Sequence, residues 1–228
     1  MQNERLIAIL GQVLEGYVST TEIEEVIVTL RKEVAVKNAK SAGKQDLYKA
    51  MMAVIKSAKK HCPREKALHG AWLDHGKQYV CNGRMIIENS GAPLMLPPLP
   101  ENIEPLHVKP FMQAREENDF LDVLRCPTVA ELKSGIAEQK ALAKYKYDKI
   151  RDVRYHLGGG HVVNAEYLQI AVQATGSTTI HAENRIAECD DNQVGELWFE
   201  SDDGMVRVLV LPVRGRPSDD STGFDYSK

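Results

Sequence analysis

One pattern occurs twice in this 228-residue chain and constrains its fold more than any other feature: a helix-forming segment followed by three short β-prone runs. In the first copy the helical segment covers about 45–61, and the runs fall within 68–88. In the second copy the helical segment covers about 165–175, and the runs fall within 178–213. Short β-prone runs divided by Gly-containing turns are typical of an antiparallel meander, and Asn82-Gly83 is a strong hairpin signal. The pattern predicts an α+β fold of two helix-plus-antiparallel-meander units.

Other segments surround these units. Residues 1–42 carry apolar residues at helical spacing and predict a helical extension of two short helices. Residues 43–214 are expected to form the α+β domain, with a proline-rich insertion at about 89–127 whose part up to Pro110 should be an extended surface connection. A helix is expected at about 129–146, with an apolar face that includes Leu132, Ile136 and Leu142. Within the insertion, residues 116–124 are expected to form one or two helical turns. The polar tail, 215–228, is expected to be disordered.

The composition excludes several classes of protein. The apolar fraction of 43% and the charged fraction of 27% are those of an ordinary globular protein. A formal net charge of −3 means that only local patches could attract nucleic acid. No apolar run is long enough to span a bilayer, and the amino terminus has no secretory signal pattern. The expected location is the cytoplasm, with no membrane association and with the four cysteines reduced.

The sequence offers little catalytic chemistry. Residues 158–161 (Gly-Gly-Gly-His) lack the Lys and the Ser or Thr of a phosphate-binding loop and are better explained as a turn. His69, His75 and Cys81 could meet in space, but they lack the close spacing of metal ligands. The adjacent acids near hairpin tips, such as Asp202 and Asp203, are typical turn formers. We therefore expect no catalytic residues, no metal and no cofactor.

Basic residues give the clearest binding signal. They gather on and just before the first helical segment: Lys44, Lys49, Lys56, Lys59 and Lys60. Several lie opposite the apolar stripe formed by residues such as Met51 and Val54. Such a face can follow a phosphate backbone without reading bases. The alternative is an ordinary solvated helix face.

The carboxy-terminal third resembles a known family. Residues 163–172 (Val-Asn-Ala-Glu-Tyr-Leu-Gln-Ile-Ala-Val) are similar to the bacterial DNA sliding-clamp segment in which a strand ends at an asparagine and a helix begins. Residues 203–214 (Asp-Gly-Met-Val-Arg-Val-Leu-Val-Leu-Pro-Val-Arg) resemble the closing strand of a clamp domain. The resemblance covers about 160–214. A fainter similarity covers the strand-turn-strand segment at 76–85.

The resemblance implies a domain whose two helices face duplex DNA and whose sheets face outward. By position, the lysines of the first helix would face the DNA, and Leu211, Pro212 and Val213 would lie near a groove for replication proteins. A complete clamp subunit has three such domains and this chain has room for one, so the resemblance implies a homo-oligomer.

The second helix departs from the clamp pattern, because Glu166, Gln169 and Gln173 occupy its outward face where a DNA-facing helix should carry Lys or Arg. The expected function is a non-enzymatic, clamp-like domain of a phage or mobile element that binds duplex DNA or replication proteins. The alternative is a protein–protein adaptor or regulator that uses the fold without binding DNA.

Overall fold

The computed structural model describes residues 20–113, 121–145, 152–158, 161–183, 195–213 and 222–226. The chain divides into two compact units, residues 1–45 and 46–228. No helix in these ranges is long and apolar enough to cross a membrane. The first helix of the expected extension, at 4–17, lies outside the described residues.

The first unit contains one described helix, α2 (Thr20–Ser41). It ends where predicted, because Gly43 adopts a φ of +70°, a left-handed conformation that favours glycine. The predicted apolar side of α2 is largely exposed: Ile27, Leu30 and Val34 are 41%, 36% and 47% accessible.

The helix α3 (Gln45–His61) has the predicted bounds, and all of it but its first residue belongs to the second unit. A short 3₁₀ turn, η1 (Lys66–Leu68), precedes the strands. The remaining helices are α4 (Lys109–Gln113), α5 (Val129–Tyr145) and α6 (Ala165–Thr175). The strands are β1 (Trp72–Asp74), β2 (Lys77–Cys81), β3 (Met85–Asn89), β4 (Leu121–Arg125), β5 (Val153–Gly158), β6 (His161–Asn164), β7 (Thr179–Glu183), β8 (Leu197–Glu200), β9 (Val206–Val210) and β10 (Thr222–Tyr226).

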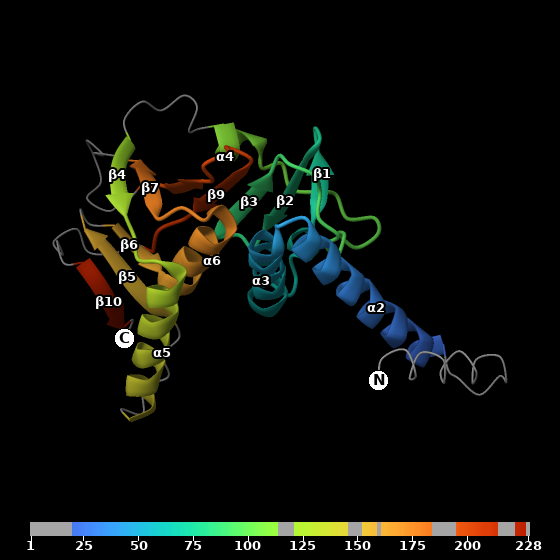
Figure 1. The fold of residues 1–228 in the computed structure, drawn as a ribbon, viewed down its shortest axis with the longest axis horizontal. Coiled ribbons are helices and arrows are strands. Elements are labelled where there is room, and N and C mark those ends of the chain that lie inside the picture. The colour runs from blue at the N-terminus through green and yellow to red at the C-terminus, as the bar shows by residue number, and fades with distance from the viewer. Residues whose placement is uncertain are drawn as a thin grey trace. The chain divides into compact units, whose positions relative to one another are not determined.

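The strands form two antiparallel sheets (Figure 1). The larger sheet has the order β1-β2-β3-β9-β8-β7-β4, and the smaller has the order β10-β5-β6. The meander that follows α3 joins the meander that follows α6 through β3 and β9, with Ile87 opposite Val208. The two-unit α+β fold is therefore confirmed, with both meanders merged into one sheet.

Alternating residues of the large sheet belong to two hydrophobic clusters. On one face, Val80, Ile87 and Val208 pack with residues of α3 and α6, including Met51 and Leu168. The opposite face carries Ile86, Trp198 and Leu209, covered in part by Val108 and Met112 from the segment that contains α4. The helices α3 and α6 therefore cover one face of the sheet, and α4 covers part of the opposite face. The Nε2 of Gln173 on α6 donates to Oδ1 of Asp46 on α3, at 3.3 Å, which places the two helices side by side.

The helix α6 has the predicted start. The side-chain oxygen of Asn164 accepts hydrogen bonds from the backbone N–H groups of Glu166 and Tyr167. At the other end, Gly176 adopts a left-handed φ of +72°, and its N–H donates to the carbonyl of Val172.

Three sequence predictions are wrong. Residues 121–124 belong to the strand β4, which pairs with β7, and not to helical turns. The proline-rich segment is not wholly extended, because α4 lies within it. The tail is not disordered throughout, because β10 pairs with β5, with Phe224 opposite Tyr155. The aromatic contact between these two rings, with centroids 4.9 Å apart, anchors the strand at a position where sequence polarity predicted disorder.

The helix α5 has nearly the predicted bounds but not the full predicted apolar face. Leu132 and Ile136 are buried as expected, whereas Leu142 is 52% exposed. Gly135 lies where α5 meets β10: a Cβ there would lie 2.1 Å from Cε2 of Phe224, so a larger residue would require the Phe224 ring to move.

Candidate partner-binding pocket and basic helix face

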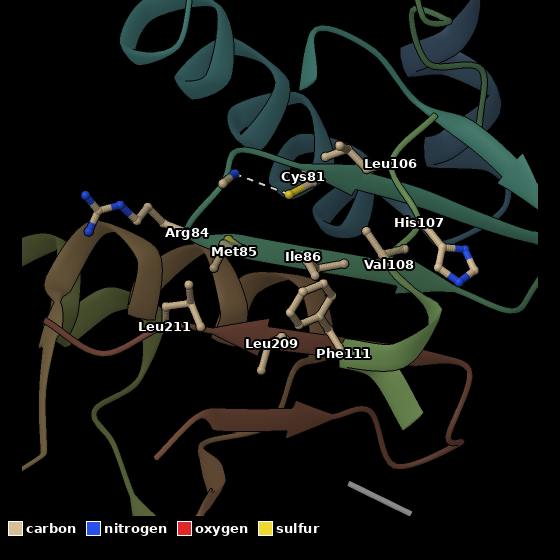
Figure 2. Close-up of a pocket in the computed structure, with 11 residues that line it drawn as sticks. Cys81, Arg84, Met85, Ile86, Leu106, His107, Val108, Phe111, Leu209 and Leu211 are labelled. Atoms are coloured by element: carbon tan, nitrogen blue, oxygen red, sulfur yellow. Dashed lines mark hydrogen bonds between the residues drawn. The ribbon is translucent and has the colours of Figure 1, made fainter. Parts of the chain in front are cut away.

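An apolar pocket opens on the sheet face opposite α3 and α6 (Figure 2). Its volume is about 240 Å³. The two meanders, the segment before α4 and α4 itself all contribute to it, through Cys81, Gly83, Arg84, Met85, Ile86, Leu106, His107, Val108, Phe111, Leu209 and Leu211. The pairing of β3 with β9 places Ile86 directly opposite Leu209, which forms the floor.

The walls of the pocket remain partly open to solvent. Leu106, Phe111 and Leu211 are 39%, 53% and 38% accessible. These side chains come from two segments far apart in the sequence, 106–111 and the residues after β9, and converge on one opening (Figure 2). Apolar groups gathered around a concavity favour binding, because a partner that covers them removes apolar area from water.

Polar groups at the pocket are few. Burial raises the pKa of the Cys81 thiol, so this sulfur is a poor nucleophile. Arg84 and His107 are exposed and lie at opposite ends of the opening (Figure 2). Among the residues that the structure describes, no carboxylate lines the pocket. The arrangement supplies an apolar binding surface rather than an acid–base pair.

The three residues expected near a partner groove have different positions. Leu211 lines the pocket. Pro212 and Val213 do not line it and are half-buried. The backbone N–H of Val213 donates to the carbonyl of Val162, at 2.8 Å, so this residue joins the end of β9 to β6.

Sequence reasoning missed most of the pocket. Leu106, Val108 and Phe111 fall in the proline-rich segment, which was expected to be only a surface connection. The available signal was the apolar spacing of Leu106, Val108, Phe111 and Met112 on either side of Pro110. That signal identifies residues that need cover, but it does not identify the strands that they meet.

The lysines predicted to bind DNA lie on and before α3. Lys49, Lys56, Lys59 and Lys60 are exposed along this helix, while Lys44 precedes it and is half-buried. The Nζ of Lys49 lies 3.3 Å from Oδ1 of Asp46, so part of its charge is compensated. The basic character therefore concentrates at 56–60, towards the carboxyl end of α3.

The neighbouring helices do not extend this basic face uniformly. Glu166 on α6 forms an ion pair with Lys140 of α5. Between α3, α5 and α6 lies a hollow of about 670 Å³, whose lining includes Asp46, Lys49 and Lys133. The hydrogen bond from Gln173 lowers the pKa of Asp46, and burial opposes that shift, so this carboxylate stays ionised beside both lysines.

A buried ionic network connects the two meanders near the pocket. The carboxylate of Glu88 on β3 is 1% exposed. It accepts hydrogen bonds from Tyr79 (2.9 Å), Arg207 (2.8 Å) and Lys77 (3.1 Å). Burial acts to raise the pKa of Glu88, but the Tyr79 hydrogen bond and the Arg207 charge outweigh it and hold the pKa below its ordinary value. Burial and the hydrogen bond to Glu88 raise the pKa of Tyr79.

Within the described ranges, no three His, Cys, Asp or Glu side chains are grouped so that they could hold a metal ion. The Nε2 of His69, one of the side chains considered as metal ligands, lies 2.9 Å from the carbonyl oxygen of Cys62.

Comparisons with protein-family models, with curated proteins and with solved structures find no match for this chain.

Proposed function

We propose that the chain is a non-enzymatic, clamp-like domain that acts in the cytoplasm. It docks a partner protein, such as a replication protein, through the apolar pocket that lies over the paired strands β3 and β9. The observation that carries the proposal is the convergence of Leu106, Phe111 and Leu211 around an opening floored by Ile86 and Leu209. Leu211 is also one of the three residues that the clamp resemblance places near a partner groove, and it is the one of the three in the pocket lining.

The pocket suits side chains of a peptide better than a whole cofactor. Its volume of about 240 Å³ falls below the range of about 300–1,000 Å³ that is typical of small-molecule sites. Apolar anchors seated in such pockets carry much of the energy in protein interfaces. A partner segment with two apolar side chains would cover the exposed walls.

The test uses the full chain and an array of synthetic eight-residue peptides. Each peptide carries two Leu or Phe residues at varied spacing in an otherwise polar sequence. We expect a subset to bind, and Leu211→Asp to weaken that binding about tenfold or more, because it places a charge in the apolar wall. Met205→Asp is the matched control, since Met205 is 47% exposed and does not line the pocket.

Unchanged binding in Leu211→Asp, or equal loss in both variants, would contradict a role for the pocket. Circular dichroism of each variant establishes that the fold is intact.

A second candidate function, sequence-independent binding of duplex DNA, is supported by the exposed lysines of α3. Four of its seventeen residues are exposed lysines, and Asp46 is its only acidic residue. This helix face could contact the phosphate backbone along a duplex if several copies of the chain assemble around it, because a single domain cannot encircle DNA.

This candidate is tested by titrating a fluorescein-labelled duplex at several salt concentrations. We expect Lys56→Glu with Lys60→Glu to reduce the slope of log affinity against log salt by about 2, because each phosphate contact contributes about 0.9. Lys109→Glu with Arg125→Glu is the control of equal charge change, on exposed residues outside α3.

The alternative, an adaptor or regulator that does not bind DNA, makes a different prediction. Light scattering would then give the mass of one chain with and without the duplex, while the peptide array would still identify ligands.

A further inference from the structure

We infer that the peptide recognised by this pocket carries an acidic residue beside its apolar anchors, and that Arg84 selects it. This inference rests on the proposed function and adds the charge of the partner. The observation behind it is an exposed guanidinium at one end of an apolar opening whose described lining residues include no carboxylate.

The backbone holds Arg84 in place independently of its side chain. Its N–H donates to Oδ1 of Asn82 at 3.0 Å, and its carbonyl accepts from the N–H of Leu211 at 2.9 Å. These bonds fix the residue at the point where the β2–β3 turn meets the end of β9. The position of Arg84 at the opening is therefore set by the sheet.

The guanidinium is available to a ligand. Within the described part of the chain it makes no ion pair with an acidic side chain, in contrast to Arg207, which pairs with Glu88. Figure 2 shows the Arg84 side chain extending from its end of the opening rather than folding over the apolar floor. A carboxylate at that end would gain a planar, two-pronged hydrogen-bond donor.

The other charged groups near the opening do not cancel this preference. His107 lies at the far end, and Glu104 precedes Leu106 without lining the pocket. A ligand that seats apolar side chains over Ile86 and Leu209 therefore meets a cation in the lining, and none of the lining residues in the described ranges is an anion. Charge complementarity indicates an acidic–apolar peptide segment as the occupant.

The experiment compares three versions of the array peptides, with Asp, Asn or Lys at each polar position in turn. With the unmodified chain, we expect one Asp position to bind about two- to fivefold more tightly than the matched Asn peptide, because the pair is partly exposed to solvent. With Arg84→Glu, the preference should reverse to Lys at the same position. Lys109→Glu makes the same charge change on an exposed neighbour outside the lining, and should leave the Asp preference in place.

The outcomes separate the two proposals. Apolar peptides that bind without an Asp preference, or a preference that Lys109→Glu alters as much as Arg84→Glu, would overturn the role of Arg84 and leave the pocket function standing. Absence of any peptide that depends on Leu211 would overturn both. Dodecanoate is a further probe: if it competes with bound peptide and needs Arg84 to the same degree, the occupant is an amphiphilic carboxylate rather than a peptide.

Discussion

In the first half of the seven-stranded sheet, the seventeen-residue helix α3 precedes three strands; in the second half, the eleven-residue helix α6 precedes three strands. Both helices contribute completely buried residues to one cluster, among them Met51 and Leu168. Their outward sides differ: α3 exposes lysines, whereas α6 exposes Glu166 and carries the half-buried Gln173 beside Asp46. The comparison teaches that the repeated apolar side specifies the shared fold, while the outward sides can diverge because packing does not constrain them.

The strongest test of a shared core is truncation of matched residues. Met51→Ala and Leu168→Ala should each lower the free energy of unfolding by about 2–5 kcal/mol, because both side chains are 0% exposed. Urea unfolding followed by circular dichroism and by tryptophan fluorescence should give one coincident transition for each variant. Leu142→Ala, at a side chain that is 52% exposed, should change stability by less than about 0.5 kcal/mol. Separate transitions in either core variant would show that the halves unfold independently.

The ion pair between Glu88 on β3 and Arg207 on β9 links the two halves of the large sheet. Glu88→Gln should lower the free energy of unfolding by about 2–3 kcal/mol at neutral pH, because Arg207 loses its buried counter-charge. The folded pKa of Glu88 lies below its ordinary value of 4.5, so its stabilisation is present above that pH and is lost as the pH falls through the folded pKa. The difference between the original chain and the variant should therefore shrink below about pH 4.5 in urea titrations at successive pH values. A difference that stays constant to pH 2 would contradict this account.

The strand β10 belongs to the three-stranded sheet, outside both halves of the large sheet, and packs on α5. Gly135→Ala should cost about 1–3 kcal/mol, because the new methyl group would overlap the ring of Phe224. In a Phe224→Ala background the same change should become neutral or stabilising, since alanine favours a helix interior by about 1 kcal/mol over glycine. Equal costs in both backgrounds would show that β10 does not pack on α5 in solution. Differential scanning calorimetry of the four proteins measures this coupling.

The smallest effect concerns the start of α6. Asn164→Ala should reduce stability by about 1 kcal/mol, because two N–H groups lose their acceptor. Hydrogen exchange should accelerate at the amides of Glu166 and Tyr167. Asn164→Ser is the control, since its hydroxyl can still cap the helix, and similar exchange in both variants would argue against a capping role.

Local patterns were sufficient to predict α3 and α6, which pack on one face of the large sheet. The bounds of α3 and α6 follow from apolar spacing and from nearby breakers such as Pro63 and Gly176. The bounds of β4 and β10 could not be predicted in this way, because both are edge strands whose partners lie far away in the sequence. The same limit applies to the candidate site, of which only Leu211 was anticipated.

The sequence by itself determined the helix-plus-meander repeat, the basic side of α3 and the turns at residues such as Gly83, because each depends on neighbours a few positions apart. Only the tertiary structure decided that β3 pairs with β9, that Glu88 meets Arg207, and that Leu106 and Phe111 join Leu211 around one opening. These contacts join segments separated by about a hundred residues. Burial of apolar side chains is favourable against any surface that fits them. Sequence periodicity therefore shows which side chains become buried, but not which strand or loop packs on them.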